Sequence, residues 1–333
     1  MRGIKIIGTG MYAPDMILSN DMLSTFLDTN DEWIYSRTGI RERRISVDKP
    51  NFYMAAEAAK AAVANSGTDP SEIDLVLAAT CSPDYFYPAL SCLVQHAVGA
   101  VNAAAFDINS ACTGFINALD TASRFLEDGD YRNILIVASE RLAPHCDYTD
   151  RTASILFGDG AGAAVVTKND KPMWSYLSAK GDYFNALYCK VDQSRSNCQY
   201  LAKTDALPVG IIDSEAKTHT LQMNGKAVYK FAVDAMDTAV RKVLERSGLG
   251  IDDIDLYIPH QANARIIESA VKSLGLPEEK VYVNLEKRGN TSSACIPTAL
   301  AELDEMGRIK DGMTICLVGF GAGLTSGAIV FTQ

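Results

Sequence analysis

Apolar and polar positions follow one another along the chain in the order of an α/β protein. Short apolar runs, such as 134–137 and 314–318, are typical of buried strands. Amphipathic stretches, such as 54–64 and 228–244, have apolar residues three or four positions apart and are typical of helices. Because helices alternate with strands, the pattern predicts a sheet protein with right-handed crossover connections.

The pattern occurs twice. Residues 64–76 and 245–257 each contain a helix end, a turn and a strand, and matching positions such as Gly67 and Gly248 are 181 residues apart. Two later pairs of segments follow in the same order along the chain. Residues 106–119 and 281–300 are each expected to form a strand, a polar turn and a helix, with the second turn at 287–291, and 134–162 and 314–323 each contain a glycine-rich strand pair. We therefore expect two similar halves, at 1–170 and 171–333. Residues 178–222 lack clear periodicity and are expected to be an insertion or lid in the second half.

Cys112 is the candidate nucleophile of the first half. It follows an apolar strand and the polar pair Asn109–Ser110, and an amphipathic helix begins near Phe115. A helix N-terminus favours nearby negative charge, so we expect a thiol there to ionise more easily. The alternative is that Cys112 is a small buried hydrophobic residue, as most cysteines are.

Two residues of the second half are candidate partners of this thiol. His260 closes an apolar strand, a place where α/β proteins often carry chemistry, although it could also be a structural histidine. Asn290 lies in the loop that corresponds to the Cys112 loop. The duplication therefore predicts that Cys112, His260 and Asn290 converge. The four histidines show no ligand spacing, so we expect no bound metal.

Two glycine patterns, at 8–13 and 158–163, match a dinucleotide-binding fingerprint. The first is followed by Pro14 and the second runs into a strand, so neither opens the helix that would hold a pyrophosphate. We expect tight backbone turns there and no nicotinamide cofactor.

Composition narrows the class of protein. The 333 residues are 47% hydrophobic and 22% charged, which is typical of a globular protein with two domains. The net charge of −10 disfavours nucleic-acid binding. Eight cysteines without CxxC pairs suggest a reducing compartment. The chain start is not a signal peptide, and no apolar run is long enough to span a bilayer, so we expect a cytoplasmic protein.

At this point five motifs resemble a known family. They are 109–115 with Cys112, 259–266 with His260, 289–292 with Asn290, 30–44, and 149–151 together with 157–162. The chain resembles the β-ketoacyl-acyl-carrier-protein synthases III, the initiating condensing enzymes of type II fatty acid synthesis in the thiolase superfamily. The resemblance covers nearly the whole chain. It implies a five-layered α-β-α-β-α fold with duplicated halves, and a homodimer.

The resemblance also implies an activity. An acyl-CoA primer would load Cys112 and then condense with malonyl-acyl-carrier-protein (malonyl-ACP), with loss of carbon dioxide, to give 3-oxoacyl-ACP. His260 and Asn290 would complete the triad, the N–H groups of Cys112 and Ala322 would form the oxyanion hole, and no cofactor would be needed. The expected CoA-binding residues are Trp33, Arg37, Arg151 and Asn263, and the expected ACP-binding residues are Gln261, Arg265, Lys230 and Lys272.

Several positions differ from the family pattern and leave the primer open. Tyr87 stands where an aromatic residue, commonly phenylalanine, crosses the dimer interface to close the partner's acyl pocket. Ser326, Tyr229, Lys226 and Ser273 also differ from common family residues. Two alternatives follow: a related acyl-CoA condensing enzyme or acyltransferase of secondary metabolism, and a non-catalytic scaffold. The intact Cys112, His260 and Asn290 argue against the scaffold.

Overall fold

The first half forms a five-stranded sheet. The computed structural model describes residues 2–191 and 219–333. The strand order is β1 (Ile4–Tyr12), β7 (Gly160–Lys168), β6 (Asn133–Glu140), β4 (Leu75–Ala79), β5 (Ala104–Ile108). β4 pairs in parallel with β5 and β6, whereas β7 is antiparallel to its two neighbours. Among the described residues, one side of the short edge strand β5 has no strand partner.

The second half forms a four-stranded sheet. Its order is β11 (Leu256–Pro259), β12 (Thr314–Gly321), β13 (Thr325–Thr332), β8 (Trp174–Ala179). β11 and β12 are parallel, and the other two pairs are antiparallel. Because β11 and β12 both run toward the same edge, with Pro259 opposite Val318, their carboxyl ends place His260 beside Gly319.

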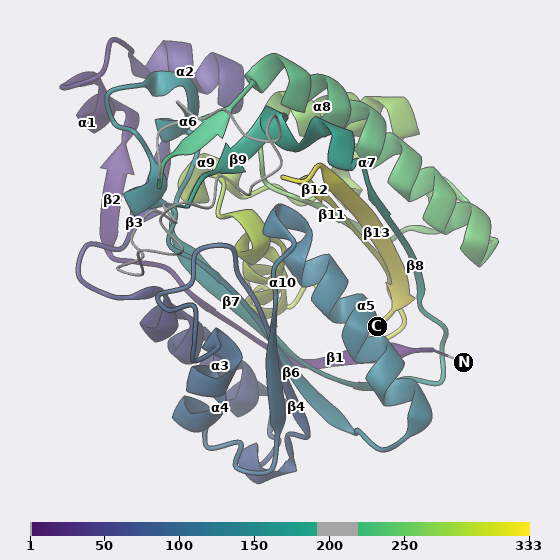
Figure 1. Cartoon of the computed structure of the whole chain (residues 1–333). Coiled ribbons are helices and arrows are strands. Elements are labelled where there is room, and N and C mark those ends of the chain that lie inside the picture. The colour runs from purple at the N-terminus through teal and green to yellow at the C-terminus, as the bar shows by residue number, and fades with distance from the viewer. Residues whose placement is uncertain (1, 192–218) are drawn as a thin grey trace, which may run out of the picture.

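Helices cover both outer faces and fill the space between the sheets (Figure 1). The buried clusters put α3 (Asn51–Ser66) and α4 (Leu90–Val98) on the first sheet, α7 (Gly225–Ser247) and α8 (Ala264–Leu274) on the second, and α5 (Gly114–Asp128) and α10 (Cys295–Glu305) between the two. The expected five-layered α-β-α-β-α fold is therefore confirmed.

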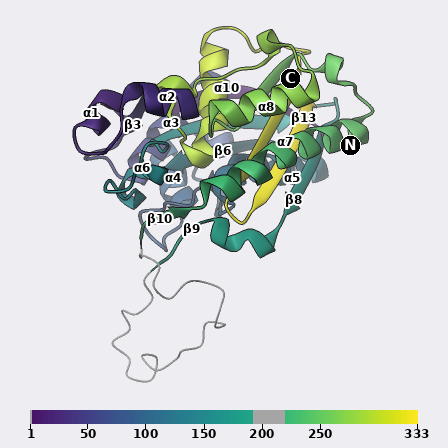
Figure 2. The same ribbon diagram turned by 90° about the horizontal axis from the view of Figure 1, so that it is seen from above.

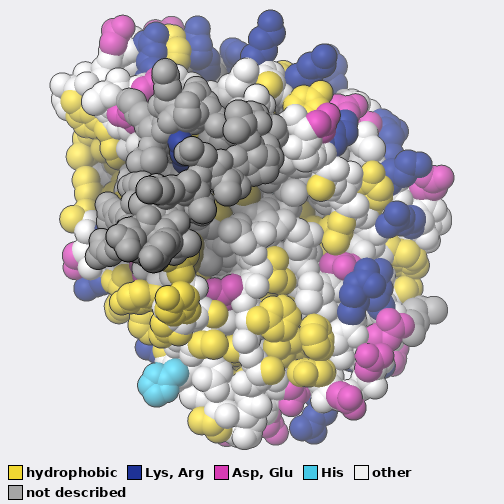
Figure 3. All heavy atoms as spheres, in the orientation of Figure 1, with side chains coloured by type: hydrophobic (Ala, Val, Ile, Leu, Met, Phe, Trp, Pro, Cys, Tyr) yellow, Lys and Arg dark blue, Asp and Glu magenta, His cyan; other side chains and the backbone are white. Residues whose placement is uncertain are grey.

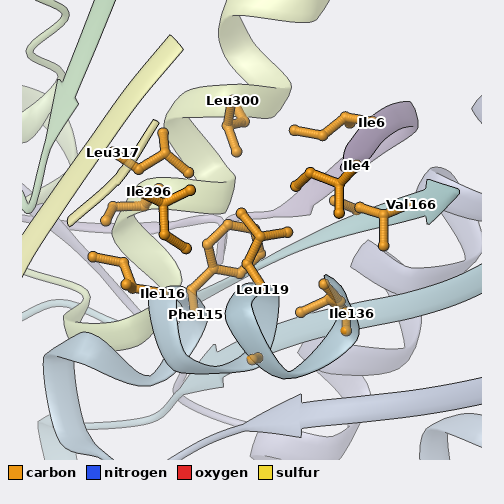
Figure 4. Close-up of a cluster of buried hydrophobic side chains, with 14 of the residues drawn as sticks. Ile4, Ile6, Phe115, Ile116, Leu119, Ile136, Val166, Ile296, Leu300 and Leu317 are labelled. Carbon is orange, nitrogen blue, oxygen red and sulfur yellow. The ribbon is translucent and has the colours of Figure 1, made fainter. Parts of the chain in front are cut away.

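The central layer is the main core of the molecule. Phe115 and Leu119 of α5 meet Ile296 and Leu300 of α10, with the inner faces of both sheets around them (Figure 4). These four side chains are almost completely buried. Burial of each stabilises the fold by about 1.5–3 kcal/mol. The two halves are thus held together by the same helices whose first residues lie at the candidate site.

Smaller elements gather at one end of the layers (Figure 2). They are α1 (Asn20–Ser24), α2 (Asp31–Thr38), α6 (Arg151–Ser154), α9 (Leu285–Arg288) and the strand pairs β2 (Met16–Ser19) with β3 (Glu42–Ile45) and β9 (Leu187–Cys189) with β10 (Leu221–Met223). The 3-10 turns are η1 (Pro70–Glu72), η2 (Ala111–Thr113), η3 (Ala143–His145), η4 (Gly181–Ala186), η5 (Ile251–Asp253), η6 (Glu278–Lys280) and η7 (Ser292–Ala294).

The internal repeat extends beyond the segments seen in the sequence. The pairs η1/η5, η2/η7 and β6/β12 all begin 181 residues apart, as Gly67 and Gly248 do. Both glycines end a helix with a left-handed backbone, at φ 67° and 72°, which explains why glycine recurs there.

The strand that the repeat predicted before the turn at 287–291 does not form. Residues 281–284 form no strand and contribute only a single bridge, between Tyr257 and Val281. The counterpart of β5 is instead the short helix α9, whose Leu, Glu, Lys and Arg are good helix formers.

The proposed insertion at 178–222 starts too early, because Ser178 and Ala179 complete β8 in the second sheet. Residues 192–218 of that segment lie outside the described residues. The described helices include none that is both long and apolar enough to cross a membrane.

Candidate active site

Cys112 sits in a tight turn between β5 and α5. It is the middle residue of η2, and Ala111 before it has a φ of 44°, which is uncommon for a residue other than glycine. The second half closes over the turn, since a Cβ atom on Gly321 would lie 2.8 Å from the Cys112 nitrogen. A residue larger than glycine at 321 would therefore displace the turn that carries the thiol.

The expectation that the Cys112 thiol ionises easily was wrong for the ligand-free chain. The residue is 6% exposed, and burial raises the pKa of its thiol to about 12, although a hydrogen bond with Ser292 acts in the opposite direction. The helix begins where the sequence predicted, but burial raises the thiol pKa more than the helix N-terminus lowers it. Cys112 is therefore a protonated thiol at neutral pH.

His260 lies at the carboxyl end of β11. Its backbone N–H donates to the carbonyl of Val318 at 2.7 Å, and its ring packs edge-to-face on Phe320 with centroids 5.3 Å apart. The residue is 1% exposed, and burial lowers the pKa of the imidazole to about 3. Nδ1 lies 2.9 Å from Sγ of Cys295, whereas Nε2 has no hydrogen-bond partner among the described residues. His260 is therefore neutral, with one nitrogen held and the other available.

Asn290 is anchored on both sides of its backbone. Its N–H donates to the carbonyl of Leu156 at 2.8 Å, and its carbonyl accepts from Gly158 N–H at 3.0 Å. The side-chain Oδ1 accepts from Ser292 N–H at 2.9 Å. This bond fixes the amide orientation, so Nδ2 is left as a donor.

One cavity of about 180 Å³ joins these three residues. Cys112, His260 and Asn290 all line it, so their predicted convergence is confirmed. The remaining wall is largely apolar and includes residues that were not among the expected site residues: Ile155, Leu156, Phe157, Leu187, Met223, Val228, Ile266, Phe320 and Gly321. Apolar residues scattered over many elements look like ordinary core positions until the fold brings them together. The described residues contain no group of three or more His, Cys, Asp or Glu that could hold a metal ion.

Of the four expected CoA residues, two line this cavity, and the other two, Trp33 of α2 and Arg151 of α6, do not. Arg37 and Asn263 line the cavity. The guanidinium carbons of Arg37 and Arg151 each lie 4.4 Å from the centroid of the Trp33 ring. A base between Trp33 and Arg151 needs roughly 7 Å, two van der Waals contacts of about 3.5 Å each. Arg151, which also bonds the carbonyl of Asp28, must therefore move before a base can be sandwiched there.

Asn263 already has a structural role. Its Oδ1 accepts from Arg265 N–H at 2.9 Å as the N-cap of α8, and its Nδ2 donates to the carbonyl of Arg37 at 3.0 Å. These bonds tie α8 to α2. Any contact with a pantetheine arm has to use the remaining donor or acceptor capacity of the amide.

Three of the four expected ACP-binding residues are exposed, and the fourth is not. Arg265 and Lys272 lie on α8 and Lys230 on α7. Figure 3 shows Lys and Arg side chains along the upper edge of the molecule, where Figure 1 places α2 and α8. Gln261 has no exposed surface, and its amide bonds the backbone of Pro259, Tyr282 and Asn284. The assignment of Gln261 to a docking surface was therefore wrong, because a carrier protein cannot reach it.

Tyr87 belongs to an exposed aromatic segment. Tyr87 is 87% exposed and Phe86 84%, and Tyr85 beside them is also exposed. None of the three lines the cavity of its own chain. The two glycine patterns lie where the sequence analysis expected, at 8–13 along β1 and at 158–163 running into β7, without a helix after either.

Comparisons with known proteins agree with this geometry. The family of 3-oxoacyl-[acyl-carrier-protein] synthase III matches residues 106–182, and the C-terminal part of the same family matches 244–333. A β-ketoacyl-[acyl-carrier-protein] synthase III from Clostridium acetobutylicum is 45% identical over 99% of this chain and 98% of its own.

Solved structures are equally similar. The 3-oxoacyl-[acyl-carrier-protein] synthase III from Aquifex aeolicus VF5 has a TM-score of 0.89 and 40% identity, over 99% of this chain and 100% of its own. The priming β-ketosynthase from the R1128 polyketide biosynthetic pathway has a TM-score of 0.87 and 38% identity, over 100% and 97%. With relatives this similar over nearly their full length, the chain belongs to the β-ketoacyl-[acyl-carrier-protein] synthase III family.

Proposed function

We propose that the protein catalyses the decarboxylating condensation of an acyl-CoA primer with malonyl-ACP, giving 3-oxoacyl-ACP and starting fatty acid synthesis. One observation carries the proposal: a buried thiol and two side chains with unpaired hydrogen-bonding nitrogens share a single cavity. A thiol suits acyl transfer, and two donors suit the oxygen of a thioester enolate.

In the first half-reaction Cys112 attacks the thioester carbonyl of the acyl-CoA. A bond forms between Sγ and the acyl carbon, the bond from that carbon to the CoA sulfur breaks, and the thiol proton ends on CoA. The N–H groups of Cys112 and Ala322 are the proposed donors to the oxyanion, and Gly321 keeps the two segments in contact. Because burial raises the pKa of the thiol to about 12, attack and proton loss have to be coupled.

In the second half-reaction malonyl-ACP replaces CoA. Its carboxylate leaves as carbon dioxide, and the electron pair forms an enolate whose oxygen takes hydrogen bonds from His260 Nε2 and Asn290 Nδ2. The α-carbon then attacks the acyl carbon on Cys112, the bond from that carbon to Sγ breaks, and the released thiolate takes up a proton from solvent to return the thiol. A neutral imidazole can donate one hydrogen bond without first losing a proton, which fits a pKa lowered to about 3.

Binding of the two substrates is assigned to exposed and half-buried groups around the cavity. Trp33, Arg37 and Arg151 bind the nucleotide end of CoA, and Asn263 binds its pantetheine arm. Arg265, Lys230 and Lys272 form the proposed basic surface for the acidic carrier protein. A local cluster of cations is what an enzyme with a net charge of −10 needs for such a partner.

We further propose a homodimer. The edge strand β5 has one side without a strand partner in the described part of the chain, and the aromatic segment 85–87 is strongly exposed. Both features favour association. Figure 3 shows hydrophobic side chains gathered on the lower half of one face. In the dimer, Tyr87 would reach the partner's cavity. We place the enzyme in the cytoplasm, which suits the free thiols of the seven described cysteines, and propose that it uses no cofactor.

A second candidate is priming of a polyketide or another secondary metabolite. It is favoured by the 38% identity to the priming ketosynthase of a polyketide pathway. The chemistry is the same, so only the primer and the carrier protein distinguish the two candidates.

The test is a reconstituted reaction with malonyl-ACP and a ladder of acyl-CoA primers, followed by the formation of 3-oxoacyl-ACP. We expect product with at least one primer and none with Cys112→Ala. Selectivity between neighbouring chain lengths should stay within about 1–3 kcal/mol per methylene. If no primer gives 3-oxoacyl-ACP while free acid or another acyl ester forms, the condensation is not the activity.

A further inference from the structure

We propose that the thiol of Cys295 positions His260 by donating a hydrogen bond to Nδ1, so that the imidazole carries its proton on Nε2. Cys295 is a positioning residue in this account, since it contacts His260 and does not line the cavity. The effect of this contact on catalysis rests on the proposed function, but the protonation of the ring does not.

The contact joins two buried side chains. Cys295 is the first residue of α10, and its Sγ lies 2.9 Å from Nδ1 of His260. The backbone N–H of Gln261, the residue after His260, points to the same sulfur atom at 3.4 Å. Both ends of the contact are almost completely buried. The His260 ring is therefore fixed by the Cys295 sulfur at Nδ1 and by edge-to-face packing against Phe320.

The surroundings of the sulfur decide which group donates. A backbone N–H can only donate, so the bond from Gln261 uses Cys295 Sγ as an acceptor. The thiol hydrogen then remains for Nδ1, which is the better acceptor. Burial lowers the pKa of His260 to about 3 and raises the pKa of Cys295, so neither a thiolate nor an imidazolium forms at rest. With Nδ1 accepting, the single proton of the neutral ring lies on Nε2.

This tautomer determines which hydrogen-bonding groups the cavity presents to a substrate. An Nε2–H group and the Nδ2 amide of Asn290 present two donors to one oxygen. The opposite tautomer would present a lone pair at Nε2, which repels an enolate oxygen. The contact between Cys295 and His260 cannot be predicted from the sequence, because Cys295 lies at the start of an apolar helix and looks like a core residue.

The internal repeat supports a specific role for this pair. At the offset of 181 residues, His260 corresponds to Ala79 and Cys295 to Gly114. The first half thus has neither the imidazole nor the thiol at these places. The pair occurs only in the half that supplies the ring to the cavity.

The direct test is nitrogen-15 NMR of ligand-free, full-length protein labelled at histidine, because ring nitrogen shifts distinguish the two tautomers. The signal of His260 is identified by its loss in His260→Gln, among the four histidines of the chain. We expect the proton on Nε2 in the wild type and in Cys295→Ser, whose hydroxyl can donate in the same way. Cys295→Ala should show a mixture of tautomers. A proton on Nδ1 in the wild type overturns the proposal, whatever the enzyme's activity.

Kinetics give a second readout. In Cys295→Ala we expect kcat for condensation with malonyl-ACP to fall roughly tenfold, the factor of one lost weak hydrogen bond. The KM for malonyl-ACP and the acylation of Cys112 should stay near wild type, and Cys295→Ser should recover kcat. Cys316→Ala, a matched change of a fully buried cysteine in β12, should leave kcat unchanged. Equal losses of kcat in Cys295→Ala and Cys316→Ala, or no recovery by serine, contradict a positioning role.

Discussion

Ser293 occupies, in the second half of the chain, the position that Cys112 occupies in the first. Each is the middle residue of a 3-10 turn, and each follows a residue with positive φ, at 50° for Ser292 and 44° for Ala111. The surroundings differ, however, because the Ser293 hydroxyl donates to Oε1 of the buried Glu140 at 2.6 Å. One member of the pair faces the cavity, and the other is bound into the core.

We predict that Ser293→Ala destabilises the fold. Glu140 has no exposed surface and also accepts from Ser82 Oγ at 2.6 Å and from Cys81 N–H at 3.1 Å. A hydrogen bond to a charged group contributes about 1.5–3 kcal/mol, so the free energy of unfolding in urea should fall by that amount. The matched control is Ser123→Ala, a fully buried hydroxyl that bonds a carbonyl of its own helix and should cost much less. Equal losses of unfolding free energy in the two variants would mean that the bond to Glu140 contributes no more than the bond of Ser123 to its own helix.

The sequence was sufficient for the parts of the fold that repeat or that follow a strong period. Gly67 and Gly248 revealed the duplication because a helix end needs the same left-handed residue in both halves. The strand expected at 281–284 was wrong because local apolar content cannot tell whether a neighbouring strand will be present to pair with it. The choice between strand and helix at this edge depends on tertiary contacts such as the Arg288–Glu302 ion pair.

The candidate site was likewise predictable from the sequence only in part. The convergence of Cys112, His260 and Asn290 followed from the repeat, since symmetric loops meet between symmetric halves. The raised pKa of Cys112 did not, because the residues that bury it come from the distant 290–322 region. The burial of Gln261 could not be predicted either, because two of its backbone partners, Tyr282 and Asn284, come from a loop more than 20 residues further along the chain.

We predict that Asn290→Asp separates the two half-reactions. An aspartate keeps an oxygen to accept the Ser292 N–H, so the turn should hold its shape, but an ionised carboxylate cannot donate. Loss of such a donor typically lowers the rate about 10²–10³-fold. Decarboxylation of malonyl-ACP, measured as carbon dioxide release, should fall by this factor while Cys112 still takes an acyl group from acyl-CoA. Full decarboxylating activity would remove this role of the amide.

Charge reversal on α8 should weaken only the carrier-protein step. Arg265→Glu and Lys272→Glu are expected to raise KM for malonyl-ACP several-fold, more at low salt, without changing the acylation rate with acyl-CoA. Lys272 is the cleaner site, because Arg265 also donates to the carbonyl of Ser36 at 3.0 Å.

The matched control is Lys310→Glu. This exposed lysine precedes β12, whose opposite end carries Gly321 at the cavity. A rise in KM that is the same for all three variants would argue against a docking surface on α8.

The burial of His260 should make the fold less stable in acid. Its pKa in the folded protein is about 3, below the ordinary value of about 6.5, so the unfolded chain takes up the proton first. This contribution is complete above pH 6.5, and it is lost progressively as the pH falls toward 3. By pH 5 the part that is lost amounts to about 2 kcal/mol. The difference in unfolding free energy between pH 7.5 and pH 5 should therefore be smaller in His260→Gln than in the wild type. An equal pH dependence in both proteins would show that the imidazole is not buried in its neutral form.

The central claim is that the Cys112 thiol carries the acyl group. The most direct measurement is intact-protein mass spectrometry after mixing with acyl-CoA, followed by peptide mapping. We predict one acyl adduct per chain, on Cys112, which is absent in Cys112→Ala although Cys81 and Cys295 remain as free thiols near the site. An adduct on another cysteine, or none with any acyl-CoA offered, would contradict the account.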